Sequence, residues 1–195
     1  MSAVLAPTAP ARLSPDEAGH VLERWIAEGE ANDARMMRAG PGIAAPVQWQ
    51  GKTGLEQMQA MLDGELPFAP IARTLDFSLL AVAPGYSLFQ GTPGAAHFNP
   101  MGSVHGGWFA TLLDSALGCA VHTLMPAGRG YTTAELSVKY VRGLSPKVGR
   151  VRAEGKVLHC GRQLATAEAR LYGPDGTLFA HATTTCLVFD LPASR

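Results

Sequence analysis

Residues 104–125 of this chain, VHGGWFATLLDSALGCAVHTLM, form a long apolar run in which Asp114 is the only charged residue. Pro126 and Gly128 follow the run as helix-ending residues. Apolar side chains lie on nearly every side of the predicted helix, from about residue 107 to 124, so we expect a core helix that a sheet wraps. A carboxylate in such a helix costs free energy unless it is paired or used. Asp114 is therefore the first candidate for a functional group.

Segments typical of β-strands flank this helix on both sides. Before it, two strands at residues 74–82 and 86–91 are expected to join at a Pro–Gly turn, and a loop spans 92–103. After it, four strands are expected at 131–142, 148–160, 163–172 and 177–189. The later connections are short, which favours antiparallel neighbours. The sequence thus predicts an α+β fold in which a curved antiparallel β-sheet wraps around the long central helix.

The first 52 residues differ from the rest of the chain in composition and in predicted secondary structure. Residues 1–13 are rich in Pro and Ala and are expected to be disordered. A capping box at Ser14 then predicts a helix that runs to about Met37, and residues 39–52 are typical of a linker. A second capped helix is expected just after that linker, ending near Gly64. We therefore divide the chain into an N-terminal helical extension, 1–52, and a main domain, 53–195.

Composition narrows the class of protein. The chain has 195 residues, 47% of them hydrophobic, which is enough for one domain with a substantial core. The 16 acidic and 16 basic residues give a formal net charge of zero, which argues against a nucleic-acid partner because phosphates require a basic surface. Cys119, Cys160 and Cys186 lie in apolar surroundings without a C-x-x-C pair. We expect three small buried side chains, no disulfide framework and a reducing, cytoplasmic compartment.

Neither a membrane span nor a metal site is expected. Asp114 lies near the centre of the apolar run, where a charge costs at least ~2.5–3.5 kcal/mol on insertion scales. The N-terminal residues lack the apolar core of a signal peptide. His122, His159 and His181 fall on different predicted elements and lack the spacing of metal ligands.

The start of the central helix offers a second functional feature. Gly106 and Gly107 can present bare backbone N–H groups at the positive end of the helix, where an oxyanion is stabilised. Asp114 lies eight residues further along, roughly 12 Å at the rise of an α-helix. That distance is too long for both groups to act on one carbonyl. If both act, the second must come from another chain, so we expect a homo-oligomer, and a monomeric variant is expected to be inactive.

Asn99, the triplet His105-Gly106-Gly107 and Asp114, in this order and spacing, resemble the PaaI-like branch of the hotdog-fold acyl-CoA thioesterases. The resemblance covers roughly residues 67–189. It implies a hotdog fold, a homodimer or homotetramer with sites shared between subunits, and hydrolysis of an acyl-CoA or aryl-CoA substrate. It implies no cofactor and no metal.

The resemblance also implies roles for five residues. Asp114 would act as general base or nucleophile, and the Gly106 N–H as oxyanion donor. Asn99 would orient the water or contact the thioester, although an Asn-Pro turn alone would explain it. His105 would support the loop. Thr133 would assist the water, but an ordinary β-branched strand residue is an equal explanation.

Candidates for substrate binding are less specific. Gly107 and Trp108 follow Gly106 in the helix, and Trp108 could line an acyl pocket or belong to the core. For the phosphates of CoA the candidates near strand ends are Arg142, Lys147 and Arg162, each of which could equally be a solvated surface charge.

Two other functions remain open. A hotdog enoyl-CoA hydratase or dehydratase would need a histidine beside a carboxylate, and its Asp-x-Asn-Pro-Leu-His signature is absent around Asn99. A non-catalytic acyl-CoA sensor would use the same pocket, but binding alone does not require the acid Asp114, and residues 14–38 lack a convincing DNA-binding helix-turn-helix.

Overall fold

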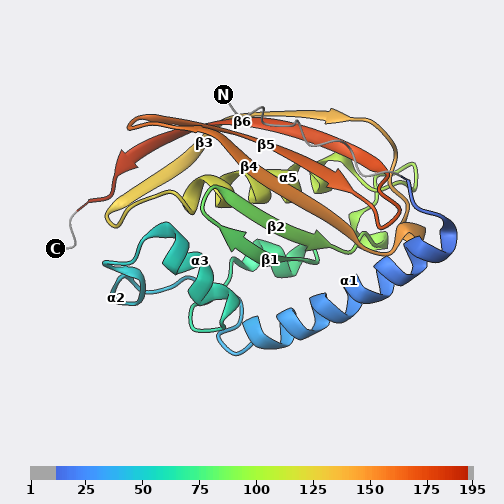
Figure 1. Cartoon of the computed structure of the whole chain (residues 1–195), viewed down its shortest axis with the longest axis horizontal. Coiled ribbons are helices and arrows are strands. Elements are labelled where there is room, and N and C mark those ends of the chain that lie inside the picture. Colours follow the sequence, from blue (N-terminus) through green and yellow to red (C-terminus); the bar gives the residue numbers. More distant parts are fainter. Residues whose placement is uncertain (1–11, 193–195) are drawn as a thin grey trace, which may run out of the picture.

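The computed structural model describes residues 12–192, so most of the segment predicted to be disordered, 1–13, lies outside the described residues. A single antiparallel sheet wraps around one long helix, and further helices gather on one side of it (Figure 1). The strands are β1 Phe77–Ala83, β2 Tyr86–Gly91, β3 Arg129–Tyr140, β4 Val151–Cys160, β5 Leu164–Tyr172 and β6 Leu178–Asp190. The hotdog architecture expected from the sequence is confirmed.

Strand order in the sheet departs from simple succession. The order is β1-β2-β4-β5-β6-β3, and every neighbouring pair is antiparallel. The prediction that the later strands are antiparallel neighbours is confirmed: β4, β5 and β6 pair in succession, and β3 pairs with β6 at the sheet edge. The connection from β3 to β4 spans residues 141–150 and includes the short 3₁₀ helix η2 Pro146–Val148, so it is too long for a tight hairpin and carries the chain across to β2.

The central helix α5, Gly106–His122, fills the concave side of the sheet. Leu112, Leu113 and Leu117 are completely buried between helix and sheet. The approach is close because the sheet carries a glycine under the helix: a Cβ on Gly155 would overlap the carbonyl of Ala116. This packing buries enough apolar surface to hold the helix in place.

One stripe of α5 is only half-buried, so the expectation of burial on every side is only partly right. The half-buried residues of this stripe recur at helical spacing and are small or polar: Ala110, Thr111, Asp114, Ser115, Cys119 and His122. They lie beside the leucine side of the helix, where Asp114 contacts Thr133 of β3 and His122 contacts Gln57 of α3. Asp114 thus lies at the boundary of the core rather than inside it.

The N-terminal helix α1, Pro15–Met36, begins at the predicted capping box and packs on the outer face of the sheet. Trp25 anchors it: the Arg152 guanidinium lies 4.4 Å from the Trp25 ring centroid, and Tyr172 meets the ring edge-on. Gln90 donates to the Trp25 carbonyl at 3.0 Å and accepts from Arg152. Because Phe89 points toward α5, its neighbour Gln90 points to the opposite face, where α1 lies.

Two short helices, α3 Gly54–Leu62 and α4 Pro70–Thr74, pack against β1 at the edge of the sheet, and a third short helix, α2 Pro46–Trp49, precedes them in the chain. Helix α3 matches the predicted capped helix, with Thr53 as its N-cap. Helix α2 falls within the predicted linker, and α4 was not expected because five residues give too short a period to recognise. Figure 1 shows α1, α2 and α3 on the β1–β2 side of the molecule. Covering this edge removes one strand that could otherwise pair with another chain.

The cysteine prediction needs one correction. Cys186 is buried and Cys119 is half-buried, but Cys160 is exposed, because it ends β4 where the strand runs past the helix it covers. Among residues 12–192, no helix is long and apolar enough to cross a membrane.

The glycine under the central helix gives a stability prediction. Gly155→Ala should lower the free energy of unfolding by about 1–3 kcal/mol, because its methyl group would overlap the Ala116 carbonyl. The matched control is Gly19→Ala in α1, where a Cβ meets nothing within 4 Å and alanine favours the helix by roughly 0.5–1 kcal/mol. Urea unfolding measures both. A neutral Gly155→Ala would contradict the close helix–sheet contact.

Candidate active site

Asp114 lies two helical turns into α5, on the half-buried stripe, and its carboxylate has a defined partner. The Thr133 hydroxyl donates to Oδ1 of Asp114 at 3.0 Å. Thr133 lies in β3 immediately before a register shift between Thr133 and Glu135, and such bulges redirect side chains next to functional sites. The structure therefore joins two of the residues proposed from the sequence, and it makes Thr133 a positioning partner of the acid.

Asp114 lies at the edge of an apolar cavity of ≈ 370 Å³. On one side, α5 and β3 contribute polar groups, and on the other side the N-terminal helices and β1 contribute apolar ones. The lining residues are Met36, Met58, Met61, Phe68, Ala69, Ile71, Ala72, Phe77, Ser78, Leu79, Phe89, Asp114, Ser115, Cys119, His122 and Tyr131. A carboxylate beside a largely apolar cavity of this size is the usual arrangement of a small-molecule site.

The polar groups on the floor of this cavity are held neutral. Burial, followed by the nearby Asp114 charge, raises the pKa of the Cys119 thiol to about 12. Burial raises the pKa of Tyr131 well above its ordinary value and lowers the pKa of His122. The His122 ring contacts Gln57 through Nε2 at 3.1 Å, while its Nδ1 is buried without a partner among the described residues. Among the described residues, Asp114 is the only Asp, Glu, Lys or Arg that lines the cavity.

The N-terminus of α5 is organised by His105. This residue is the N-cap, and its Nδ1 accepts a hydrogen bond from the Gly107 N–H at 2.8 Å. The supporting role expected for His105 agrees with this contact. The Trp108 N–H donates to the His105 carbonyl. Gly106 occupies the first helical position, whose N–H has no acceptor within the helix.

Gly106 borders a second, open hollow of ≈ 300 Å³. The Tyr140 hydroxyl donates to the Gly106 carbonyl at 2.9 Å, and a Cβ on Gly106 would lie 3.2 Å from the Tyr140 ring. Arg142 lines the same hollow, beside Val104 and Phe109. Tyr140 was not among the candidates selected from the sequence. Its contact with Gly106 joins the exposed end of β3 to the start of α5, and only the folded structure shows this contact.

Asn99 stabilises the loop that leads into α5. Its Oδ1 accepts from the backbone N–H groups of Met101 and Ser103, at 3.0 and 3.2 Å, and its Nδ2 donates to the Ser103 hydroxyl. Gly102 has φ +79°, which completes this tight turn. Within a single chain, Asn99 belongs with the Gly106 end of the helix and does not line the cavity of Asp114.

The remaining candidates for substrate binding lie in different parts of the structure. Trp108 is 3% exposed, stacks on His97 with ring centroids 5.5 Å apart and donates through Nε1 to the Leu75 carbonyl, so in this chain it belongs to the core. Lys147 is exposed in η2, in the loop that also carries Arg142. Arg162 lies in the turn between β4 and β5, where its carbonyl accepts from Arg129, roughly 35 Å along β3 from Tyr140.

The candidate residues therefore form two groups on one helix. Asp114 lies at the apolar cavity with Thr133 as its hydrogen-bond partner, and Gly106, His105 and Arg142 lie at the helix N-terminus. Because α5 is continuous from Gly106 to His122, eight residues separate Gly106 from Asp114, or about 12 Å. Among residues 12–192, no three His, Cys, Asp or Glu side chains lie close enough to hold a metal ion.

The hydrogen bond made by His105 separates a structural role from a chemical one. His105→Ala should lower the free energy of unfolding by about 1 kcal/mol because the Gly107 N–H loses its acceptor, and His105→Asn should recover most of that loss because asparagine is a good N-cap. Urea unfolding tests both variants. Equal destabilisation by alanine and asparagine would argue against the capping role.

Comparison with known proteins shows to which superfamily the chain is related. The sequence profile of the thioesterase superfamily matches residues 101–180. A curated protein of Halobacterium salinarum, provisionally assigned as an esterase, is 36% identical over 84 residues. That match spans 42% of this chain and 54% of the other protein, so the chain spans about half the length of this relative.

Solved structures extend the likeness. A phenylacetic acid degradation-related protein of Ralstonia eutropha, provisionally assigned as a thioesterase, is 29% identical with a TM-score of 0.61, over 67% of this chain and 98% of its own. A variant of the phenylacetic acid degradation protein PaaI from Thermus thermophilus is also 29% identical, with a TM-score of 0.55, over 60% and 97%. A further thioesterase superfamily protein is 33% identical, with a TM-score of 0.54, over 61% and 89%. Together with the fold and the Asn99, Gly106 and Asp114 pattern, these matches show that the chain belongs to the thioesterase superfamily, as a PaaI-like protein with the hotdog fold.

Proposed function

We propose that the protein hydrolyses acyl-CoA or aryl-CoA thioesters to the free acid and CoA. The observation that carries the proposal is the position of Asp114. Its carboxylate is half-buried at the edge of a ≈ 370 Å³ apolar cavity and is oriented by the Thr133 hydroxyl. An oriented carboxylate next to an apolar cavity can activate water against an acyl group that the cavity holds.

The reaction follows from these groups. Asp114 removes a proton from water as the water oxygen attacks the thioester carbonyl carbon. The negative charge that develops on the carbonyl oxygen is stabilised by the Gly106 N–H, at the positive end of α5. The C–S bond then breaks, the CoA sulfur takes the proton, and the acid is released. No metal or cofactor is needed in this sequence of steps.

Thr133 and Asn99 assist in different ways. Thr133 donates to Oδ1 of Asp114 and so fixes the direction of the carboxylate, which leaves Oδ2 for the water. Asn99 shapes the loop that ends at the helix N-terminus, and through that loop it fixes the position of the Gly106 N–H. In a shared site its amide could also reach the water.

The 12 Å between Gly106 and Asp114 requires two chains in each site. Two surfaces support this arrangement. Near Gly106 the half-buried stripe of α5 carries the small residues Ala110 and Thr111, which do not line the cavity and suit a second helix packed against them. Strand β3 forms the free edge of the sheet over twelve residues, and an edge of that length is suited to pairing with another strand. An antiparallel dimer would bring Asp114 of one chain to Gly106 of its partner.

The nucleotide end of CoA requires positive charge. Arg142 lines the hollow at Gly106, and Lys147 lies further along the same exposed loop, so both are candidates for phosphate contacts. Arg162 lies at the other end of β3 and could contribute only across a subunit interface.

The hydratase alternative finds less support. It needs a histidine beside the carboxylate, whereas the partner of Asp114 is a threonine. His122 lies eight residues further along α5, and the Nδ1 of His105 is already occupied by the Gly107 N–H. A sensor would not need the oriented acid.

Substitution of the acid tests the chemistry. Asp114→Asn keeps the shape and can still accept from Thr133, but it cannot take a proton from water, so kcat should fall by roughly 10²–10⁴. Release of CoA thiol from a panel of acyl-CoAs measures the effect. The matched control, Glu23→Gln, removes an exposed acid of α1 and should leave the rate unchanged. Full activity in Asp114→Asn would exclude the proposed base.

Mixing two inactive variants tests the shared site. Asp114→Asn supplies an intact Gly106, and Gly106→Val supplies an intact Asp114 while its side chain crowds Tyr140. After the subunits are exchanged in equal amounts, half of the dimers are mixed and each has one intact site, so activity should recover to about a quarter of the wild type. Each variant alone, refolded in the same way, is the control. No recovery in verified mixed dimers would mean that both groups act within one chain.

A further inference from the structure

Most of the wall opposite Asp114 comes from outside the region that matches the thioesterase superfamily. That region begins at residue 101, whereas Met36 of α1, Met58 and Met61 of α3, and Ile71 of α4 precede it. Phe68 joins them from the loop before α4. The helices that cover the β1 edge thus also close the cavity beside the acid.

We propose that these N-terminal helices form the acyl-binding site and restrict the protein to thioesters of apolar acyl groups, medium-chain or aryl-substituted. This inference rests on the thioester hydrolysis proposed above. It assigns a role to the helical segments that precede the matched region, and it names the class of substrate.

The chemistry of the wall supports an apolar acyl group. Within residues 12–192, Asp114 is the only Asp, Glu, Lys or Arg that lines the cavity, so a second charge on the acyl group would have no counter-ion from this part of the chain. Three methionines lie in the wall: Met36, Met58 and Met61. Methionine is flexible and polarisable, so it can adapt to linear and aromatic groups alike.

The size of the cavity sets the range of acyl groups that it can accommodate. At ≈ 370 Å³ it exceeds twice the roughly 150 Å³ that accommodates benzene in an apolar protein cavity. An acetyl group would leave most of the space empty and would gain little from burial. Each additional buried methylene should raise kcat/KM by about fourfold until the cavity is full.

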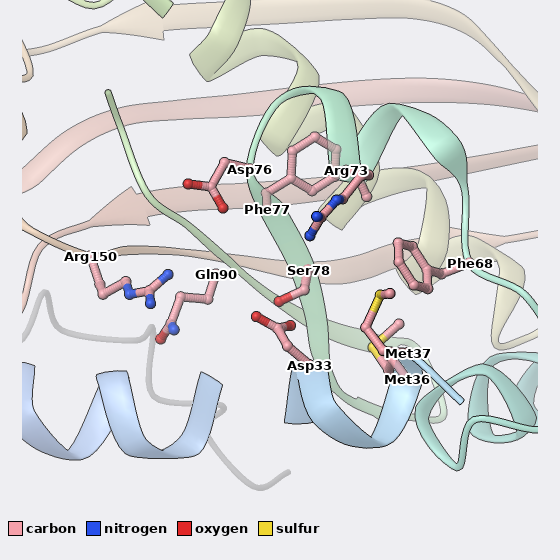
Figure 2. A pocket seen from close by; sticks show the side chains of 11 residues that line it. Asp33, Met36, Met37, Phe68, Arg73, Asp76, Phe77, Ser78, Gln90 and Arg150 are labelled. Atoms are coloured by element: carbon pink, nitrogen blue, oxygen red, sulfur yellow. The ribbon is translucent and has the colours of Figure 1, made fainter. Parts of the chain in front are cut away.

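A polar region next to the cavity limits the length of the acyl chain. Met36, Phe68 and Phe77 also line a second cavity of ≈ 80 Å³, on the other side of this wall. Figure 2 shows four charged side chains around that smaller cavity: Asp33, Arg73, Asp76 and Arg150. An apolar chain that passed the wall would meet these charges, so activity should fall once the larger cavity is filled.

Substitutions in the wall should change the ranking of substrates. Ile71 is half-exposed at the cavity, so Ile71→Trp can fill space without disturbing the core, and Met61→Trp fills it from α3. In both variants the ratio of kcat/KM for decanoyl-CoA to that for butyryl-CoA should fall at least about tenfold. Met61→Ala enlarges the cavity and should shift the preference toward longer chains. The measurement is thiol release over acyl-CoAs of increasing length, with phenylacetyl-CoA included.

The control is Ile43→Trp, which places the same ring on a residue that is 93% exposed and does not line the cavity. Its substrate ratio should equal that of the wild type. If the esters are hydrolysed but the wall variants keep the wild-type ratio, the acyl site lies elsewhere while the thioesterase proposal stands. If the wild type hydrolyses none of the esters, the proposed function fails and this inference fails with it.

Discussion

Everything in this protein depends on how closely α5 packs against the sheet. Leu112, Leu113 and Leu117 are completely buried, and Gly155 lets the sheet approach the carbonyl of Ala116. The Ser87 hydroxyl donates to that same carbonyl at 2.6 Å, so the contact is directional as well as apolar. Because one side of the helix is committed to this contact, its orientation is fixed, and so is the direction in which every other residue of the helix points.

The functional groups follow from that orientation. Once the leucines face the middle of the sheet, Asp114 points to one side of it, where it meets Thr133 of β3 and the cavity that the N-terminal helices close. The charge is then only half-buried, which avoids the cost of a carboxylate in a closed core. The same constraint separates the acid from the helix N-terminus by two turns, so the geometry of one helix is the physical argument for a site built from two chains.

The N-terminal helices combine two functions through a single set of contacts. Helix α1 is held on the outer face by Trp25, Gln90 and Arg152, while its last turn reaches the cavity with Met36. The same helices therefore both cover the β1 edge of the sheet and close the cavity. In the acyl-site proposal, this peripheral segment is a wall of the site, so substitutions in it would alter substrate choice without contacting the acid.

The sequence by itself determined the central helix and the antiparallel sheet, and it selected Asp114 as a candidate, because hydrophobic periodicity, capping boxes and a single charge in an apolar run are local signals. It also brought Asn99, Gly106 and Asp114 into one motif through family resemblance. Only the tertiary structure decided that β3 pairs with β6, that Thr133 donates to Asp114, that Trp108 belongs to the core and that Cys160 is exposed. These features depend on which segments contact one another in the folded sheet, and no local sequence pattern specifies contacts between residues that are distant in the sequence.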